Sequence, residues 1–408
     1  MDTQHAQSEL SSTSAVALDQ PTSHSASGFT DEVSMHADTT KTVDIRVNTP
    51  PAQTWNYLNV NNVTFTLPQG RVSGSLYARL PQLFDRVPYG LGSEAQAWID
   101  SVAPDSHFYE VPKGQHAEKP IVLNVNADNN EMKDSGILIR EGAEACVVLV
   151  SHATSNKESS SANVARIIVE RDATLHLVEI VAMSDTHQHL QGTGLQLDDR
   201  AHVDVHQYAL GGKQVAFGFE ANMQGASCRL DLMLRYLVRG DERLDINHIA
   251  RQRGRNTRCT MLSNGILYDR AHKTLRETID LVHGAKGSKG NEAETVLVAS
   301  DDVRNETLPV ILCDEDDVMG NHGASIGSIG PEQLGYLSDR GLTEEEANEL
   351  FERAIFDDAA IHAPDAASRE AVLAYARTIM GDEVADDFHD ALGDDRAYSY
   401  EVHGAIED

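Results

Sequence analysis

The side chains best suited to chemistry lie in residues 308–329, LPVILCDEDDVMGNHGASIGSI. This segment combines the thiol of Cys313, four consecutive acids at 314–317 and the imidazole of His322. A thiolate and a neutral imidazole are suitable ligands for iron or zinc. Nine residues separate Cys313 from His322, so the two side chains converge only if the chain folds back between them. A structural histidine beside an unreactive cysteine is the alternative interpretation.

Two further patterns resemble catalytic motifs but lack the features that those motifs require. Residues 323–327, GASIG, match G-x-S-x-G, but a hydrolase elbow needs a buried strand before the serine and a helix directly after it. An acidic run precedes this motif and SIGP follows it, so we predict no hydrolase elbow. The glycine-rich stretches at 211–213 and 284–290 do not fit the phosphate-loop pattern G-x-x-x-x-G-K-[ST]. The chain therefore has no recognisable ATPase loop of its own.

Paired histidines and single cysteines give weaker signals. His187 with His189, and His202 with His206, would each share one face of a strand. No thiol or carboxylate completes either pair at a metal-binding spacing, so surface histidines are predicted. The cysteines stand singly at 146, 228, 259 and 313 without C-x-x-C, which predicts neither a disulfide framework nor a zinc ribbon. Such cysteines are by default buried small hydrophobes.

The elements that must position these groups are mostly strands. Alternating apolar runs at 137–139, 147–149, 166–169 and 202–206 predict strands across residues 108–330. A strand-only segment with few aromatic residues favours a β-solenoid, and a pair of β-sandwich domains is the alternative. Between the runs recurs a turn in which glycine or a charged residue precedes alanine. These alanines, 30, 28, 25, 45 and 14 residues apart, are Ala143, Ala173, Ala201, Ala226, Ala271 and Ala285.

The flanks of this core differ in composition. Residues 1–42 are predicted to be a disordered leader, because 14 of the first 40 residues are Ser or Thr, and residues 43–107 form an N-terminal region. Residues 331–408 carry 21 acidic and 5 basic side chains and form an acidic helical subdomain. Within it, a Thr343–Glu346 capping box opens one helix, with apolar positions at 347, 350, 351 and 355, and a second helix is expected over 366–380.

Overall composition excludes several classes of protein. With 64 acidic and 33 basic side chains the formal charge is −31, so nucleic acid is an unsuitable partner. The first ten residues lack the pattern of a secretory signal. No run approaches the roughly 18 apolar residues that cross a bilayer. We therefore expect a soluble, cytoplasmic protein that does not enter a membrane.

The segment 311–351 resembles the SufB/SufD family of iron–sulfur cluster assembly proteins. The resemblance rests on DDV-x-x-x-HGA followed by YL-x-x-RG, with further matches at 54–60, 111–114, 246–257 and 264–309, and it covers about residues 46–360. The sequence MGNHGA at 319–324 resembles the SufD side of the family. The implied fold is mainly β: a right-handed parallel β-helix with a small N-terminal region and a C-terminal helical subdomain.

The resemblance also implies a function and partners. A SufD-like chain is a non-enzymatic scaffold that pairs with a SufB-like subunit, while its helical subdomain binds the ATPase SufC, which hydrolyses the ATP. The nascent cluster is assembled from iron and persulfide sulfur at the interface between SufB and SufD. On this chain the family's histidine maps to His322. No thiol directly precedes it, so we assign Cys313, the nearest thiol, as a second metal ligand or sulfur acceptor. The implied contacts with SufC are Tyr336, Leu337, Arg340 and Gly341.

The resemblance further implies which groups bind and where this chain departs from the family. No tightly bound cofactor is expected, since iron or an iron–sulfur cluster would be held transiently; flavin is associated with the complex, but no motif for it occurs here. Many SufD sequences have Cys–Ser before the histidine, whereas this chain has Gly320 and Asn321, and Gly335 stands where phenylalanine is common. Alternatives are a SufB-like scaffold that pairs with itself, giving a homodimer in isolation, and a β-helix carbohydrate-active enzyme.

Overall fold

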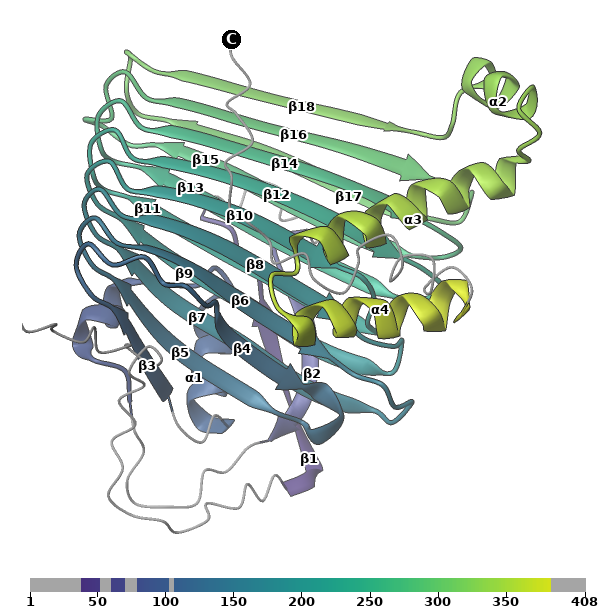
Figure 1. Cartoon of the computed structure of the whole chain (residues 1–408), viewed down its shortest axis with the longest axis horizontal. Coiled ribbons are helices and arrows are strands. Elements are labelled where there is room, and N and C mark those ends of the chain that lie inside the picture. Colours follow the sequence, from purple (N-terminus) through teal and green to yellow (C-terminus); the bar gives the residue numbers. More distant parts are fainter. Residues whose placement is uncertain (1–37, 52–59, 70–78, 103–105, 383–408) are drawn as a thin grey trace, which may run out of the picture.

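The molecule is built around two parallel sheets of eight strands each, which face one another (Figure 1). The computed structural model describes residues 38–51, 60–69, 79–102 and 106–382. The chain alternates between the sheets, so that each strand pairs with the strands two before and two after it. This is a parallel β-helix, which confirms the predicted solenoid and excludes the pair of β-sandwiches.

The solenoid strands run from residue 106 to residue 327, close to the predicted 108–330. The even sheet contains β4 (Ile121–Asn126), β6 (Glu144–His152), β8 (Thr174–Ala182), β10 (His202–Ala209), β12 (Arg229–Val238), β14 (Arg258–Leu267), β16 (Lys289–Val298) and β18 (Met319–Gly327). The odd sheet contains β3 (Ser106–Val111), β5 (Met132–Ile139), β7 (Ser159–Val169), β9 (His187–Leu197), β11 (Gln214–Met223), β13 (Arg243–Gln252), β15 (His272–Leu281) and β17 (Arg304–Cys313). A short 3-10 helix, η3 (Ala127–Asn129), follows β4.

Alternate side chains of every strand point into the space between the sheets, which we call the lumen. In the even sheet, Leu175, Val203, Leu230 and Cys259 lie in register on consecutive coils, and each is at most 2% exposed. Stacking similar side chains from coil to coil removes their apolar surface from water. Burial also raises the pKa of the Cys228 thiol to about 12. Cys146, Cys228 and Cys259 are thus the buried hydrophobes that the sequence predicted.

The recurring turns form the corners of the coils. Gly142, Asp172 and Arg200 have φ between 57° and 65°, and the alanine after each is at most 1% exposed. The left-handed residue reverses the chain, and the small alanine fits into the corner. The irregular spacing arises because Ala271 lies at the opposite edge, between β14 and β15, whereas the other five alanines lie between an odd strand and the next even strand.

The N-terminal region covers the outer face of the odd sheet. It comprises the antiparallel pair β1 (Asp38–Val47) and β2 (Val63–Gln69), the 3-10 helix η2 (Gln82–Arg86) and α1 (Ser93–Val102). Its apolar side chains pack on Val164 and Leu190 of the solenoid. β1 begins within the predicted leader, of which residues 1–37 lie outside the described part. A Cβ on Gly194 or Gly218 would lie 2.5 Å from the backbone of the loop 87–92, so these glycines allow the loop to lie against the sheet.

Polar contacts fix this N-terminal region to strands far along the chain. The Asn48 amide donates to the backbone oxygen of Asp245 at 2.9 Å and to its Oδ1 at 2.8 Å. Arg276 donates to both carboxylate oxygens of Asp245, at 2.7 and 3.1 Å, and to the backbone oxygen of Val60. The early residues are therefore tied to β13 and β15.

Within residues 331–382, three helices follow the solenoid: α2 (Pro331–Ser338), α3 (Glu344–His362) and α4 (Ala366–Met380). Helices α3 and α4 pack on the outer face of the even sheet (Figure 1), and α4 has the predicted bounds. The capping box is confirmed, since Thr343 Oγ1 accepts from the Glu346 N–H and Glu346 accepts from the Thr343 N–H. The apolar positions of α3 are only partly covered, because Leu350 is 51% exposed and Phe351 is 45% exposed.

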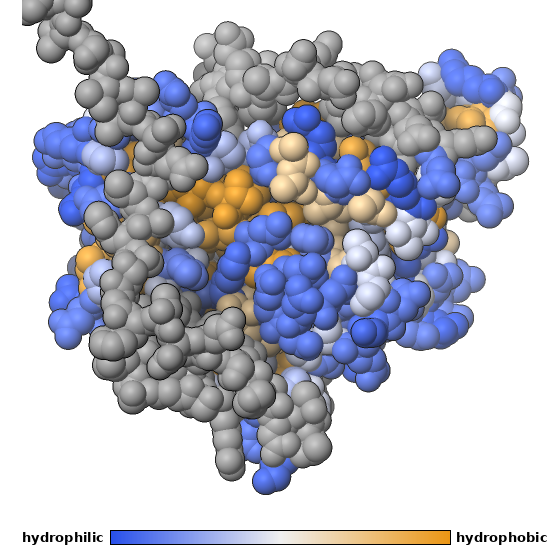
Figure 2. Space-filling model, turned by 60° about the horizontal axis from the view of Figure 1, so that its bottom comes forward, coloured by the Kyte–Doolittle hydropathy of each residue, from blue (hydrophilic) through white to orange (hydrophobic). Residues whose placement is uncertain are grey.

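Most of the described residues on the face seen from the side of the early coils are hydrophilic, and they surround an apolar patch (Figure 2). None of the helices in the described ranges has the length and apolar composition needed to span a bilayer.

Candidate functional site

The last coil of the solenoid leaves one strand edge of each sheet open. β17 and β18 are the terminal strands of the odd and even sheets, and no other described strand pairs with their outer edges. All nine residues of β18 are exposed, and none is Lys, Arg, Asp or Glu. Proteins usually protect such edges with charged residues, proline or bulges. β17 carries Pro309, but β18 offers unprotected backbone hydrogen-bonding groups for another chain.

His322 is the last member of a row of side chains that faces the lumen. It is in register with Glu292, which continues the row through Met261 and Leu232. Leu232 and Met261 belong to the lumen core, so the alternation of the strand gives His322 the same inward phase. Because no coil lies beyond it, the histidine is exposed.

Cys313 ends the corresponding row on the odd sheet. It is in register with Leu281 and then Gln252, and it is the exposed member of the chain's four free thiols. Its Sγ donates to the backbone oxygen of Glu315 at 3.3 Å. The Glu315 carboxylate accepts from the Gly284 N–H at 2.9 Å, which lowers its pKa. This acid therefore holds the turn, while Asp314, Asp316 and Asp317 remain exposed.

The coil geometry separates the two predicted ligands. Gly320 faces Ile311 across the lumen, since a Cβ built on it would lie 3.0 Å from Ile311 Cγ2. Cys313 lies two residues past this contact on β17, and His322 lies two residues past it on β18. The chain reverses between the strands, so the two residues diverge by about 13 Å along the strand direction at ~3.3 Å per residue. Within the described part of the chain, no three His, Cys, Asp or Glu side chains could hold a metal ion together.

Charged side chains fill the lumen directly below this open end. Lys273 Nζ lies 2.5 Å from Glu294 Oε1, and the two side chains are at most 1% exposed. Tyr236 and Thr307 donate to the two oxygens of Glu294, at 2.7 and 2.5 Å. Burial lowers the pKa of Lys273 and raises that of Tyr236. The lumen of the last coils therefore contains a hydrogen-bonded ion pair.

Glu292 lies one coil below His322 and is 1% exposed. Burial, together with the nearby Glu277, raises the pKa of Glu292 to about 9, and the backbone N–H of Val310 partly offsets this. A carboxyl with such a pKa is neutral at pH 7. The position under His322 is thus polar without carrying charge.

The four residues expected to contact the ATPase lie on helix α2 and in the turn that follows it. Helix α2 has no buried residue; Tyr336 is 58% exposed, and Leu337 is half-buried. The Arg340 guanidinium lies 3.5 Å from the centroid of the Tyr336 ring and donates to the Tyr336 backbone oxygen at 3.1 Å. Gly341 has a φ of 88°, which turns the chain toward α3. With the exposed Leu350 and Phe351, α2 and the start of α3 present a partly apolar surface.

Several other sequence predictions have clear outcomes. Ser325 lies within β18 and no helix follows it directly, so the rejection of a hydrolase elbow is confirmed. The prediction of surface histidines is wrong for His187 and His189, which are fully buried. His189 contacts Ser161 Oγ at 2.8 Å, and burial lowers its pKa to about 4. Period-two alternation gives the phase of a strand but does not show that both of its faces are covered.

The comparison with known families decides what this solenoid is. The family model described as "SUF system FeS cluster assembly, SufBD core domain" matches residues 123–355, more than half of the chain. The chain belongs to the SufB/SufD family. The match includes most of the solenoid, His322, Cys313 and the start of α3.

Individual relatives are distant and longer than the matched region. The chain is 25% identical to the iron–sulfur cluster assembly protein SufD of Bacillus subtilis over 254 residues, which are 60% of this chain and 57% of that protein. It is 22% identical to SufD of Escherichia coli over 261 residues, 62% of this chain and 61% of that protein. A SufBD family protein of Staphylococcus saprophyticus is 24% identical over 66% of this chain and 59% of its own length. The chain thus spans about three fifths of these relatives.

Proposed function

We propose that this protein is a SufD-like scaffold subunit that pairs with a SufB-like subunit through the open end formed by β17 and β18. The observation that carries the proposal is the exposed, charge-free edge of β18 with His322 at its lumen-facing position. A partner strand would satisfy the free backbone groups of this edge and would cover the exposed Met319 and Ile326.

His322 contributes one side of the cluster-assembly site in this proposal. An imidazole is a suitable ligand for iron, which is here the cargo of the scaffold. Because the described residues of this chain supply no three-ligand group, the remaining ligands come from the partner. Cys313 lies at the same end and acts separately, as an exposed thiol that can accept sulfur or bind iron.

The helical surface of α2 and the start of α3 binds the SufC ATPase. Tyr336, Leu350 and Phe351 are exposed by 45–58%, and they gain burial when a partner covers them. Arg340 orders Tyr336 by stacking on its ring. The chain itself is a non-enzymatic scaffold, and SufC hydrolyses the ATP. The cytoplasmic location stays a prediction, and so does the transient rather than tight binding of iron, a cluster or flavin.

Reconstitution with SufB-like and SufC proteins tests the role of His322. We expect His322→Ala to lower the yield of cluster, followed by its visible absorption, by about tenfold while leaving complex formation intact. His283→Ala is the matched control, since His283 lies in a turn near the same end and its side chain is 81% exposed. Equal cluster yields for the two variants would refute the role of His322.

A SufB-like scaffold that pairs with itself is the second candidate, because the two open edges of one chain can also pair with those of a second copy. Light scattering on the chain alone, and with a SufB-like partner, separates the two. A homodimer that persists in the presence of the partner would favour the second candidate. Membership of the SufB/SufD family speaks against the carbohydrate-active enzyme.

A further inference from the structure

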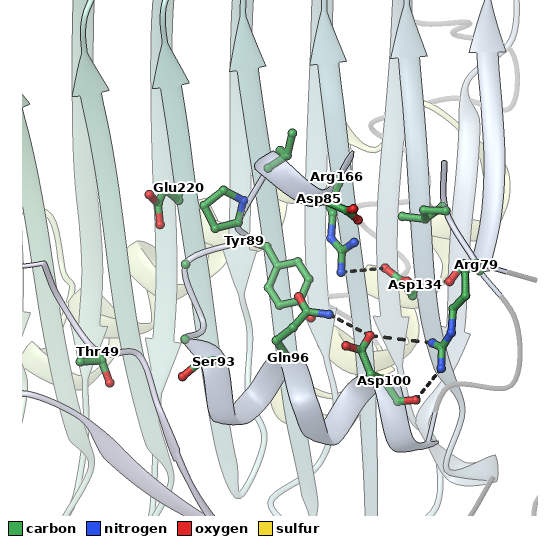
Figure 3. A pocket seen from close by; sticks show the side chains of 16 residues that line it. Thr49, Arg79, Asp85, Tyr89, Ser93, Gln96, Asp100, Asp134, Arg166 and Glu220 are labelled. Atoms are coloured by element: carbon green, nitrogen blue, oxygen red, sulfur yellow. Dashed lines mark hydrogen bonds and ion pairs between the residues drawn. The ribbon is translucent and has the colours of Figure 1, made fainter. Parts of the chain in front are cut away.

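A second site lies on the opposite flank of the molecule from α3 and α4. A cavity of about 650 Å³ lies between the N-terminal region and the outer face of the odd sheet (Figure 3). Its floor comes from β3, β5, β7 and β11, and its wall from α1 and the loop 87–92. Ligand pockets for small molecules usually have volumes of about 300–1,000 Å³. Neither His322 nor the helical surface contributes to this cavity.

The floor holds a buried guanidinium whose ion pair is stretched. Arg166 is 8% exposed, and its Nη2 lies 4.0 Å from Asp134 Oδ1, beyond hydrogen-bond distance. The guanidinium carbon lies 5.3 Å from the centroid of the Tyr89 ring, so the aromatic face contributes to holding the cation. Figure 3 shows Arg166, Tyr89 and Asp134 side by side in the cavity.

Two buried polar atoms next to this guanidinium lack hydrogen bonds. Tyr89 is 2% exposed, and its hydroxyl has no hydrogen-bond partner among the described residues. Asp134 is 3% exposed; its Oδ2 accepts from Ser106 Oγ at 2.6 Å, but its Oδ1 has no hydrogen bond within the described part. Buried polar atoms are normally hydrogen-bonded. A donor, a cation and an acceptor with unused capacity thus lie together.

Two other acids that line the cavity, Glu220 and Asp100, already have partners, which leaves Arg166 and Asp134 for a ligand. Glu220 accepts from Arg251 Nε at 2.8 Å. Asp100 accepts from Gln96 Nε2 at 2.9 Å and lies 3.8 Å from Arg79 Nη1 (Figure 3). Asp85 is an exposed acid at the rim.

We propose that the cavity binds a small zwitterion with a carboxylate and an ammonium group attached to the same carbon, that is, a free α-amino acid. The ligand carboxylate contacts Arg166 and the Tyr89 hydroxyl, and its ammonium group contacts Asp134 Oδ1. Arginine suits carboxylates because its planar N–H groups match both oxygens. A simple anion would place its charge beside Asp134, and a simple cation would lie beside Arg166. A zwitterion satisfies both groups.

Calorimetric titration of the full chain with each of the twenty free amino acids tests this proposal, with acetate and ethylamine as the single-charge probes. We expect saturable binding of at least one amino acid with a Kd below about 1 mM, and binding of acetate and ethylamine at least about tenfold weaker. Failure of all twenty amino acids to bind, or acetate binding as tightly as the best amino acid, would overturn the proposal.

Variants of the floor locate the binding. Tyr89→Phe removes only the unpartnered hydroxyl, so we expect an affinity loss of about fivefold or more with no fall in melting temperature. Asp134→Asn removes the ammonium partner, and we expect about a tenfold loss for the amino acid and none for acetate. Arg140→Met is the control, since Arg140 pairs with Glu110 and Glu170 away from the cavity. Unchanged affinity in both Tyr89→Phe and Asp134→Asn would refute the site.

Discussion

Buried carboxyl groups have different partners in the covered middle coils and at the open end of the solenoid. In the middle coils, Glu179 accepts from the amides of Gln191 at 2.9 Å and Gln207 at 3.2 Å, and burial raises its pKa. At the open end, Glu294 is paired with the cation of Lys273. The middle lumen therefore contains neutral amide donors, whereas the end contains full charges.

The middle coils and the open end also differ in how far other elements cover them. The middle coils are covered on one side by the N-terminal region and on the other by α3 and α4, while β18 is bare along its whole length. An exposed strand edge and a buried ion pair are both costly to maintain. Both features occur at one end of the solenoid, which supports the proposal that a partner binds there.

Breaking the ion pair should give the largest effect on stability. Lys273→Met leaves Glu294 buried without its cation, which typically costs about 3–5 kcal/mol in the free energy of unfolding. Gln191→Leu in the middle coils removes a neutral donor and should cost about 1–3 kcal/mol. Urea unfolding of both variants measures the difference. Equal losses would remove the distinction between the two regions, and recovery in Lys273→Met with Glu294→Gln would confirm its electrostatic origin.

The free energy of unfolding should depend on pH through Glu242, which belongs to the covered region and lies in the turn between β12 and β13. Burial raises the pKa of Glu242 to about 8, against hydrogen bonds from the Arg239 and Gly212 N–H groups. The folded state therefore holds the proton more tightly than the unfolded chain. This stabilisation is complete below about pH 4.5 and is lost as the pH rises through about 8, by at most ~1.4 kcal/mol per pH unit.

Melting temperatures of the wild type and Glu242→Gln between pH 5 and 9 check this sign. We expect the wild type to lose stability relative to the variant as the pH rises. A difference that stays constant with pH would show that Glu242 has an ordinary pKa.

A charge on the bare edge should weaken pairing with the SufB-like partner. Ile326 is 53% exposed on β18, and Ile326→Lys introduces the kind of residue that protects natural strand edges. We expect at least about a tenfold loss of affinity, or ~1.4 kcal/mol, in a direct binding assay. Leu83→Lys, at a residue 43% exposed on η2, is the matched control and should bind normally. Similar affinities for the two variants would move the interface away from β18.

The smallest effect is expected from salt on SufC binding. The described residues 331–382 carry 12 acidic and 4 basic side chains, so the helical surface is strongly negative. Raising the ionic strength from about 0.1 M to 1 M shortens the screening length from ~10 Å to ~3 Å, and we expect a several-fold weaker association. Affinity that does not change with salt would return these acids to a solubility role and leave the apolar residues of α2 and α3 to carry the contact.

Much of the architecture followed from local sequence patterns. The alternating runs placed strands, the alanine turns marked corners, and the Thr343–Glu346 box fixed the start of α3, because each depends on neighbouring residues. The sequence patterns did not predict which side chains would be buried by other parts of the chain. His189 is polar yet lies in the lumen, and Phe351 is apolar yet exposed, because their surroundings are set by segments distant in the sequence.

The sequence likewise predicted the residues of the candidate site but not their arrangement. His322 and Cys313 were found from residue type and motif, but their separation follows from coil geometry that no spacing reveals. The cavity around Arg166 and Asp134 had no sequence signal, because its residues come from β5, β7 and a loop at residue 89, each unremarkable alone.

The contacts of Asn48 with Asp245, and of Val60 with Arg276, impose an order on biosynthesis. The ribosome makes the N-terminal residues first, but the surface that receives them is completed 197 to 216 residues later. The early segment must therefore wait, without its final packing, until β13 and β15 have emerged. Contacts so distant in the sequence slow folding and leave apolar surface exposed in the meantime. During synthesis, the N-terminal region therefore exposes apolar surface of the kind that chaperones protect.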